Sequence, residues 1–325
     1  MSVTLVQAVT MALARAMEQD DRVLLLGQDI GVNGGVFRAT DGLFKKFGDR
    51  RVLDTPISES AIIGSSIGMA ARGLRPVAEI QFMGFLYAGL DQLLSHAGRL
   101  RSRTRGRLSC PMVIRTPFGG GIRAPEHHAD SLESILAHSP GTRVVIPSSP
   151  SRAYGLLLSA IQDPDPVVFM EPIRLYRGSK EPVDDDGGVL PLDTCFVLRE
   201  GRDITLVTWG SCVAEVSEAA DQLEEEGISA EIIDVASISR LDMDTIFGSV
   251  ERTGRCVIIH EAPLTAGFGA EIAARLADEG LLSLRAPVKR VGGFDTAYPL
   301  YRLEDHYLPT THRILEACRA VLDFE

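Results

Sequence analysis

The sequence predicts an α/β protein with two domains, each built on a mostly parallel sheet covered by helices. The chain has 325 residues, which is enough for two cores at about 100–200 residues per domain. Short β-branched runs alternate with longer helical patterns, as expected for βαβ units. Residues 178–194 are rich in Asp, Gly and Pro, so they predict a linker between domains 1–177 and 195–325.

The first domain is expected to begin with an amphipathic helix. The segment MSVTLVQAVTMALARAMEQDD has the apolar spacing of such a helix and lacks the basic leader of a signal peptide. Six strands follow, and several are continuous apolar runs typical of buried parallel strands. The expected strands are Arg22–Gly27, Arg51–Asp54, Pro76–Gln81, Met112–Thr116, Arg143–Pro147 and Val167–Met170. The expected helices between them are Ser60–Arg72, Leu86–Arg101, Ser131–His138 and Arg152–Ile161.

The second domain repeats the alternation of strands and helices, which again indicates a parallel sheet. The expected strands are Ile204–Thr208, Ala230–Val235, Cys256–His260 and Val288–Val291. The expected helices are Ala214–Glu226, Met243–Thr253, Ala270–Asp278 and Ile314–Leu322. Within this domain, Gly267-Phe-Gly269-Ala-Glu-Ile272 approaches a dinucleotide fingerprint but lacks its third glycine. Close packing of a helix start is therefore favoured over phosphate binding.

Composition excludes several classes of protein. Lys and Arg number 33 against 44 Asp and Glu, a net charge of −11, which disfavours nucleic-acid binding. No apolar run approaches the roughly 20 residues of a membrane span. The five cysteines are widely spaced without a C-x-x-C pair. They indicate reduced thiols in a cytoplasm and argue against a disulfide framework or a zinc site.

The first candidate site lies in residues 54–64, where a strand ends at Pro56 and Glu59 opens a helix of small and apolar residues. One interpretation is electrostatic, because a carboxylate is favoured at a helix N-terminus. The other is functional, because open α/β sheets bind ligands at the carboxyl ends of their strands. In that case Ile57, Ile62 and Ile63 are expected to desolvate the carboxylate and raise its pKa.

Two further segments contain candidate residues. In RTPFGGGIRAPEHHADS, three glycines precede His127 and His128. Such a loop suits proton transfer or simple solvation, and metal binding is less favoured because no Cys or carboxylate stands at ligand spacing. The segment Gln81–Asp91 carries Phe82, Phe85 and Tyr87. These rings either stack against a flat ligand or belong to the core.

Taken in order, several segments resemble one enzyme family. The segments TPISE, RPVAEIQF, IRTPFGGG, EHHADSLE, DPVVFMEP and LYR are similar to the beta subunits of the decarboxylating component of 2-oxo acid dehydrogenase complexes, which depends on thiamine diphosphate. The resemblance extends through the second domain in ITLVTWG, GISAEIIDV and SVERTGR. The motifs IQFMGF and PFGGG are closer to the bacterial pyruvate-specific branch. The branched-chain branch and acetoin dehydrogenase stay open as alternatives.

The resemblance implies a pyrimidine-binding thiamine-fold domain over residues 1–177 and a transketolase-like C-terminal domain over residues 195–325. It implies that Glu59 bonds a pyrimidine ring nitrogen and thereby promotes removal of the thiazolium proton. By the same matching, Phe85 stacks on the pyrimidine, Ile57 lies beside it, and His128 assists acylation of the lipoyl group. Gln28 stands at a cofactor-binding position where the family commonly has Glu, and an amide cannot carry charge.

The resemblance also implies partners and ions. Related enzymes hold the diphosphate through magnesium with a Gly-Asp-Gly run, which this chain lacks. The implied partner is an alpha subunit that holds the magnesium in an α2β2 heterotetramer. The acyl group of a small 2-oxo acid would then pass to a dihydrolipoyl acyltransferase core. A structural potassium ion would map to Met112, Ala160, Ile161, Asp163 and Asp165. The alternative from another class is a catalytically idle scaffold subunit, with Gln28 as an early sign of decay.

Overall fold

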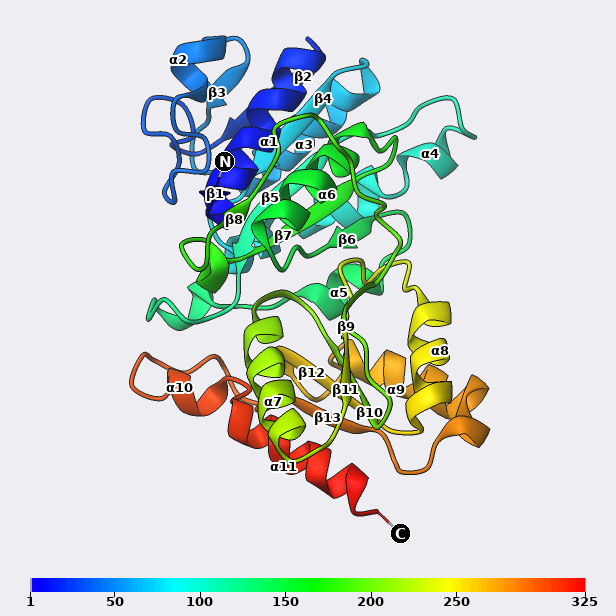
Figure 1. Cartoon of the computed structure of the whole chain (residues 1–325). Coiled ribbons are helices and arrows are strands. Elements are labelled where there is room, and N and C mark those ends of the chain that lie inside the picture. The colour runs from blue at the N-terminus through cyan, green and yellow to red at the C-terminus, as the bar shows by residue number, and fades with distance from the viewer. Residues whose placement is uncertain (1, 325) are drawn as a thin grey trace.

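The computed structural model describes residues 2–324, which form two α/β domains arranged end to end (Figure 1). The first domain contains a six-stranded parallel sheet with the order β3-β2-β4-β5-β7-β6. The strands are β2 (Val23–Gly27), β3 (Val52–Asp54), β4 (Arg75–Glu79), β5 (Val113–Phe118), β6 (Arg143–Val145) and β7 (Val167–Pro172). All six lie where the sequence predicts strands, so the predicted parallel sheet is confirmed.

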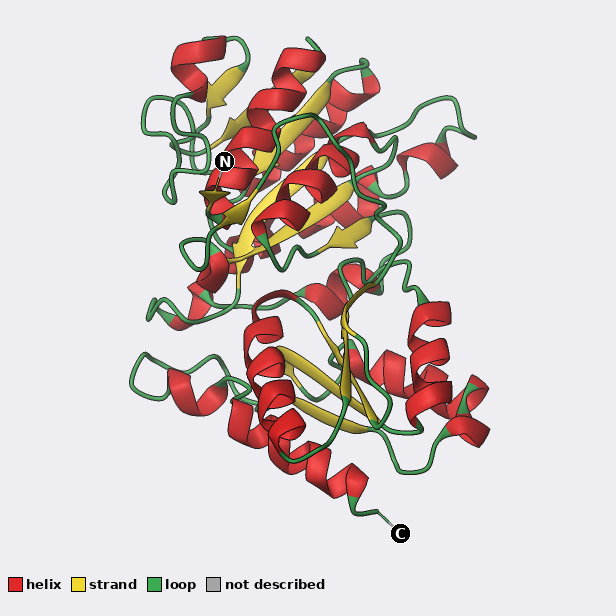
Figure 2. Cartoon of the chain, viewed as in Figure 1, coloured by secondary structure: helices red, strands yellow, loops and turns green. Residues whose placement is uncertain are grey.

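Helices flank the strands in both domains (Figure 2). In the first domain, α1 (Leu5–Gln19) and α6 (Pro150–Gln162) share a core with Val23 and Leu25, whereas α3 (Glu59–Ala71) shares another with Leu24 and Leu26. Successive side chains of β2 thus point to opposite faces, as the pleat of a strand requires. Local sequence also sets the helix starts. Ser149 caps α6 by accepting a bond from Arg152 N, with Pro150 in the first turn.

The segment predicted as one helix over Leu86–Arg101 is different in the structure. It contains a 3₁₀ helix η1 (Met83–Gly89), a π-helical stretch η2 (Asp91–Ala97) and a short α4 (Leu100–Arg103). Glycine explains the difference, because a Cβ added at Gly89 would lie 2.5 Å from Ile63 Cδ1. Packing of this segment against α3 therefore overrides regular helical geometry.

The second domain has a five-stranded mixed sheet with the order β13-β12-β10-β11-β9. The parallel strands β10 (Ile204–Thr208), β11 (Ala230–Asp234), β12 (Cys256–Pro263) and β13 (Lys289–Gly293) lie at the predicted positions. The antiparallel edge strand β9 (Phe196–Arg199) is not predicted by the sequence. Its residues are partly exposed, so it lacks the continuous apolar run that marks a buried parallel strand.

The helices of the second domain lie on both faces of this sheet. The helices α7 (Val213–Glu225) and α11 (Thr311–Leu322) share one core with β10. The opposite face carries α8 (Met243–Thr253) and α9 (Gly269–Glu279). A short α10 (Glu304–Tyr307) precedes α11. The core containing α8 and α9 continues into the first domain through Phe118 and Met170, so the two domains share buried apolar contacts.

Residues 178–194, which the sequence predicts as a linker, run along the first domain. The strand β8 (Glu181–Pro182) pairs antiparallel with β1 (Ser2–Val3). Tyr154 Oη donates to Asp185 Oδ1 at 2.8 Å, and Leu190 packs so closely on Gly155 that no side chain fits there. This segment is therefore held to β1 and α6 before the chain enters the second domain.

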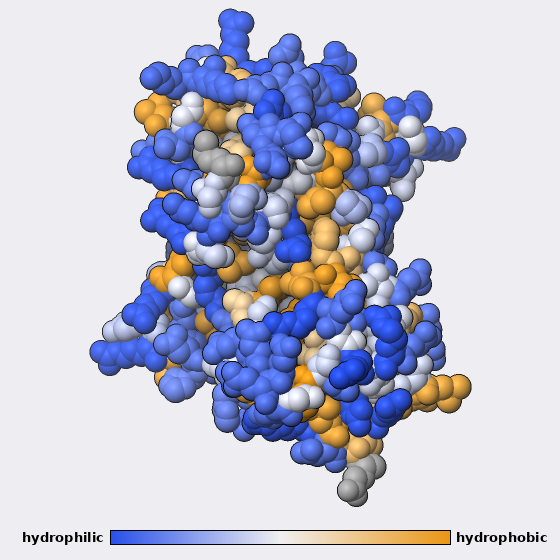
Figure 3. All heavy atoms as spheres, viewed as in Figure 1, coloured by the Kyte–Doolittle hydropathy of each residue, from blue (hydrophilic) through white to orange (hydrophobic). Residues whose placement is uncertain are grey.

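On the face shown in Figure 3, hydrophobic residues gather where the two domains meet. All five cysteines are free and buried. None of the helices within residues 2–324 is long and apolar enough to cross a bilayer.

Candidate active site

The candidate residues converge on the carboxyl edge of the first sheet. Gln28 directly follows β2, Glu59 opens α3 after β3, and Phe85 lies in η1 after β4. His128 ends the short 3₁₀ helix η3 (Glu126–His128), which follows β5. Because parallel strands end at one edge, residues far apart in sequence meet there. Their roles stay predictions.

Aromatic side chains cluster with the two histidines at this edge. The ring centroids of Phe82 and His128 lie 4.4 Å apart and those of Phe85 and His128 lie 5.2 Å apart, both edge to face. Tyr87 stacks on His127 at 6.2 Å. Phe82 and Phe85 are half-buried, and Tyr87 is 47% exposed. The interpretation of all three as core residues is therefore wrong for Tyr87, and the two phenylalanines are only partly covered.

The η1 turn lies between the histidine loop and the start of α3. At Gly84, a Cβ would collide with the carbonyl oxygen of His127. At Gly89, a Cβ would lie 3.3 Å from the carbonyl oxygen of Glu59. These close backbone approaches bring the turn that carries Phe85 against both candidate catalytic segments.

The surroundings of Glu59 differ from the sequence-based expectation. Glu59 is half-buried, but Ile57 is 75% exposed, whereas Ile62 and Ile63 are buried in the core beneath α3. The expectation that Ile57 desolvates the carboxylate is wrong within this chain, because its side chain faces outward. Ser58 occupies the N-cap position without a side-chain hydrogen bond.

A buried ionic cluster that was not predicted from the sequence lies in β4, β5 and β7. Arg115 in β5 donates to both carboxylate oxygens of Glu171, at 2.7 and 2.8 Å, and to Glu79 Oε2 at 2.9 Å. Tyr176 Oη donates to Glu171. We call Arg115, Glu79, Glu171 and Tyr176 the strand-end cluster. Its sequence signal is the charged residue in each of three apolar strands, with Glu79 directly opposite Arg115 in register.

Charge pairing sets the protonation of the strand-end cluster. Burial alone would lower the pKa of Arg115, but the carboxylates of Glu171 and Glu79 raise it above its ordinary value. Burial raises the pKa of Glu79 although Arg115 opposes this shift. Burial beside Glu171 also raises the pKa of Tyr176, so the phenol stays protonated and continues to donate.

A second group of buried polar residues lies where the domains meet. Glu261 in β12 accepts hydrogen bonds from the Gly120 backbone N–H and, at 2.9 Å, from Ser211 Oγ. Glu133 is fully buried, and neither of its carboxylate oxygens has a hydrogen-bond partner. The Tyr298 hydroxyl is likewise buried without a partner. We call Glu133, Glu261, Ser211 and Tyr298 the interface cluster.

The interface cluster has no buried cation bonded to its carboxylates. Burial raises the pKa of Glu133 to about 7; the negative charge of Glu261 adds to this shift, whereas the Glu133 backbone N–H and the Trp209 side chain oppose it. Burial also raises the pKa of Glu261, against its bond from Gly120 and the nearby positive charge of Arg174. Sequence reasoning missed this cluster because Glu261 and Tyr298 come from the other domain, and no local pattern marks them.

The glycines of the Gly267–Ile272 segment pack against a buried histidine. His260 stacks on Trp209 with ring centroids 5.3 Å apart. A Cβ at Gly267 or Gly269 would lie 2.7 or 2.8 Å from the His260 ring, so the predicted close packing of this helix start is confirmed. Burial lowers the pKa of His260 to about 4, which keeps the imidazole neutral at pH 7.

The positions predicted for potassium come from the start of β5, the end of α6 and the turn after it. These are Met112, Ala160, Ile161, Asp163 and Asp165. Arg75 Nη1 donates to the carbonyl oxygens of Ile161 at 2.7 Å and Asp163 at 3.4 Å. Arg143 Nε lies 2.9 Å from Asp163 Oδ2. Arginines already supply positive charge to the Ile161 and Asp163 oxygens, and the potassium site stays a prediction.

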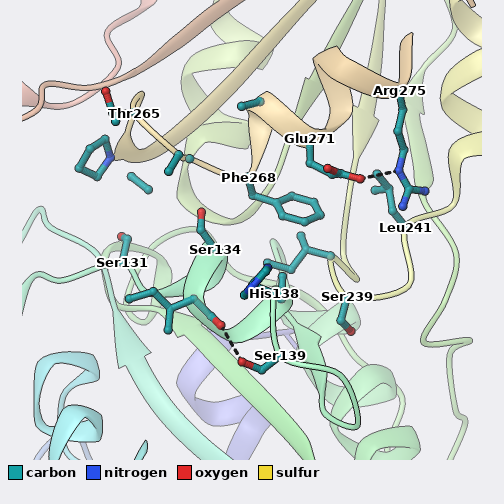
Figure 4. A pocket seen from close by; sticks show the side chains of 18 of the residues that line it. Ser131, Ser134, His138, Ser139, Ser239, Leu241, Thr265, Phe268, Glu271 and Arg275 are labelled. Carbon is teal, nitrogen blue, oxygen red and sulfur yellow. Dashed lines mark hydrogen bonds and ion pairs between the residues drawn. The ribbon is translucent and has the colours of Figure 1, made fainter. Parts of the chain in front are cut away.

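An open groove of about 940 Å³ lies between the domains (Figure 4). Ser131, Ser134 and His138 lie on its first-domain side, and Thr265 and Phe268 face them from the second domain. None of the candidate residues Glu59, Phe85 and His128 lines this groove. Throughout residues 2–324, no group of three or more His, Cys, Asp or Glu side chains is placed to hold a metal ion.

Comparison with known proteins agrees with this two-domain arrangement. Residues 1–179 match the family described as the transketolase pyrimidine binding domain, and residues 193–314 match the transketolase C-terminal domain. A solved structure of a split-gene transketolase, an inactive β4 tetramer, superimposes with a TM-score of 0.82 and covers 100% of this chain and 99% of its own. Its sequence identity is 22%, so this likeness concerns the fold.

Curated relatives match over nearly the whole chain. The pyruvate dehydrogenase E1 component subunit beta of Bacillus subtilis is 49% identical over 321 residues, covering 99% of both chains. The subunits of the same name from Staphylococcus epidermidis and Staphylococcus aureus are 48% and 46% identical with the same coverage. The chain therefore belongs to the family of beta subunits of the thiamine-diphosphate-dependent E1 component of 2-oxo acid dehydrogenases.

Proposed function

We propose that this chain is the beta subunit of a pyruvate dehydrogenase E1 component. Together with an alpha subunit, it would decarboxylate pyruvate and transfer the acetyl group to lipoyllysine on an acyltransferase core. The observation that carries the proposal is the edge of the first sheet, where Glu59, Phe85 and His128 come from three separate segments. Full-length relatives bearing this name support the choice of pyruvate.

The residues at this edge fit the pyrimidine half of a thiamine cofactor. The half-exposed ring of Phe85 offers a flat apolar face, and the half-buried Glu59 offers an acceptor for a ring nitrogen. His128 Nδ1 is buried without a partner, so it has hydrogen-bonding capacity to spare. The residues proposed to bind the pyrimidine are Gln28, Ile57, Glu59 and Phe85. When bound, thiamine diphosphate supplies the electron sink that decarboxylation requires.

Each proposed catalytic residue has a task that its chemistry allows. The Glu59 carboxylate would hold the proton shared with the pyrimidine nitrogen, which an amide cannot do. The His128 imidazole would give or take a proton as the acyl group moves to a lipoyl sulfur. Gln28 would contribute hydrogen bonds but no charge.

The diphosphate half of the cofactor requires a partner. The only Gly-Asp pair, Gly48-Asp49, is followed by Arg50 and not by a glycine. The net charge of −11 cannot replace magnesium in neutralising a diphosphate. We propose that an alpha subunit in an α2β2 heterotetramer holds magnesium and covers the exposed Ile57 side chain. The free, buried cysteines suit a cytoplasmic enzyme.

The substrate can be tested by co-expressing the chain with its alpha subunit and comparing kcat/KM for pyruvate, 2-oxoisovalerate and acetoin. We expect pyruvate to give the highest value. A higher value for 2-oxoisovalerate would assign the chain to the branched-chain enzyme, and preferred turnover of acetoin would assign it to acetoin dehydrogenase. No turnover of any substrate by a folded assembly would support the idle scaffold subunit.

In the same assembly, Glu59→Gln should reduce turnover by about 10²–10⁴-fold, because an amide cannot replace a carboxylate in proton transfer. Hydrogen–deuterium exchange at the thiazolium carbon measures this step directly. Glu251→Gln, the same change at an exposed carboxylate of α8, is the control and should keep wild-type activity. Exchange at the wild-type rate in Glu59→Gln would contradict the proposed role.

A further inference from the structure

The loop that carries the two histidines begins with three glycines, and each is pressed against a larger side chain. A Cβ at Gly119 would lie 2.8 Å from Glu261 Oε1, and one at Gly121 would lie 2.5 Å from Arg174 Cδ. A Cβ at Gly120 would collide with the hydroxyl of Tyr298. Gly119 and Gly121 also have positive φ values of 82° and 94°, which side chains rarely adopt.

Glu261 is bonded directly to this loop from the second domain. One carboxylate oxygen accepts the Gly120 N–H, and the other accepts the Ser211 hydroxyl at 2.9 Å. Glu261 is 5% exposed, so water competes little for these bonds. Ser211 lies in the turn after β10, which fixes the carboxylate between two elements of the second domain.

The far end of the same loop is also held by the second domain. Ala129, next to His128, packs with Tyr298, Tyr307 and Leu308 in a small buried cluster. Within the loop, His128 N bonds the carbonyl oxygen of Pro125 at 2.9 Å. His128 therefore lies in a loop that is held to the second domain by a hydrogen bond at Gly120 and by apolar packing at Ala129.

We infer that Glu261 is a positioning residue that fixes the Gly119–Asp130 loop and so holds His128 against Phe82 and Phe85. The part concerning catalysis rests on the proposed function of His128, whereas the part concerning the loop does not. The hydrogen bonds of Glu261 go to Gly120 and Ser211 and not to His128. Glu261 acts through Gly120, at the point where the loop leaves β5.

Hydrogen exchange of the full chain tests the loop directly. In Glu261→Ala, the amides of residues 119–130 should exchange about 10–100-fold faster, the effect expected when a hydrogen bond to a charged acceptor is lost. Glu261→Gln keeps an oxygen acceptor for Gly120, so its acceleration should be below about tenfold. If Glu261→Ala does not fold, Ser211→Ala, which removes one of the two bonds to the carboxylate, should give an intermediate acceleration.

Glu231 provides a matched control on the same sheet. It is also buried and also bonds a backbone N–H, that of Gly201 at 3.2 Å, together with Arg252 at 2.6 Å. Glu231 and Cys256 both pair in register with Thr205, and Cys256 lies five residues before Glu261 in β12. Glu231 is therefore displaced from Glu261 by about 16 Å along the strand direction, toward the opposite end of the strands. Glu231→Ala should leave exchange of the 119–130 amides unchanged.

In the assembled enzyme, Glu261→Ala should slow acyl transfer to a lipoyl domain more than decarboxylation with an artificial electron acceptor. Glu261→Gln should recover most of the difference. Wild-type exchange in Glu261→Ala, or equal acceleration in Glu231→Ala, would overturn the inference about the loop. Equal losses in both assays would overturn its catalytic part. Absence of turnover in the wild type would count against the proposed function while leaving the exchange result to decide the role of Glu261.

Discussion

The strand-end cluster and the interface cluster bury carboxylates close to the same site in opposite ways. In the first, Arg115 donates hydrogen bonds to the carboxylates of Glu79 and Glu171, and Tyr176 donates a further bond to Glu171. In the second, no cation is bonded to Glu133 or Glu261, and Glu261 accepts its bonds from neutral groups. A buried charge is tolerated when paired and tends to protonate when unpaired. The first cluster thus holds its carboxylates in ion pairs, whereas Glu133 in the second is able to change protonation near neutral pH.

The variant with the largest expected effect on stability removes the cation of the strand-end cluster. Arg115→Met leaves Glu79 and Glu171 buried without a counter-charge, and should lower the free energy of unfolding by about 3–5 kcal/mol. Urea unfolding at pH 7 measures it. Arg101→Met is the control, because its pair with Asp165 at 2.7 Å is partly exposed and such pairs are worth at most about 1 kcal/mol. A loss below 1 kcal/mol for Arg115→Met would mean that the cluster tolerates unpaired charge.

The next test concerns pH. The pKa of Glu133 is about 7 in the folded chain against an ordinary value of 4.5, so the folded state binds more protons between these values. Its stabilising contribution is complete below about pH 4.5 and is lost as pH rises through about 7, a change of roughly 3 kcal/mol. Glu133→Gln should therefore become more stable relative to the wild type as pH rises from 5 to 8.

Urea unfolding of Glu133→Gln and the wild type across this pH range provides the comparison. The exposed Glu251 supplies the control, since Glu251→Gln should follow the wild type at every pH. Other buried acids, such as Asp234 with a pKa raised by burial to about 6, contribute equally to both proteins and cancel. Parallel curves for Glu133→Gln and the wild type would show that Glu133 has a partner in solution.

The smallest expected effect on stability comes from a comparison of one tyrosine from each cluster. Tyr176→Phe removes a hydrogen bond to the Glu171 carboxylate and should cost about 1.5–3 kcal/mol. Tyr298→Phe removes a buried hydroxyl that has no partner, so it should be neutral or stabilise by up to about 1 kcal/mol. Thermal unfolding of the two variants side by side measures the difference. Equal destabilisation by both changes would erase the distinction between the clusters.

Much of the fold was predictable because its signals are local. The apolar run of β2 and the largely apolar run of β10 mark parallel strands, since both of their faces are buried. The edge strand β9 and the broken helix at residues 83–103 were missed, because pairing at an exposed edge and packing of Gly89 on Ile63 depend on distant neighbours. The candidate residues Glu59 and His128 follow strand ends, and this position is itself a sequence feature.

The sequence by itself determined the alternation of strands and helices, the edge at which Glu59, Phe85 and His128 gather, and the lack of a Gly-Asp-Gly motif. Only the tertiary structure decided which buried carboxylates are paired and which are not. Glu261 bonds a backbone N–H 141 residues away, and no periodic pattern encodes such a contact. Periodicity reports which face of an element is buried. The partner found on that face depends on strand register and on how the two domains pack.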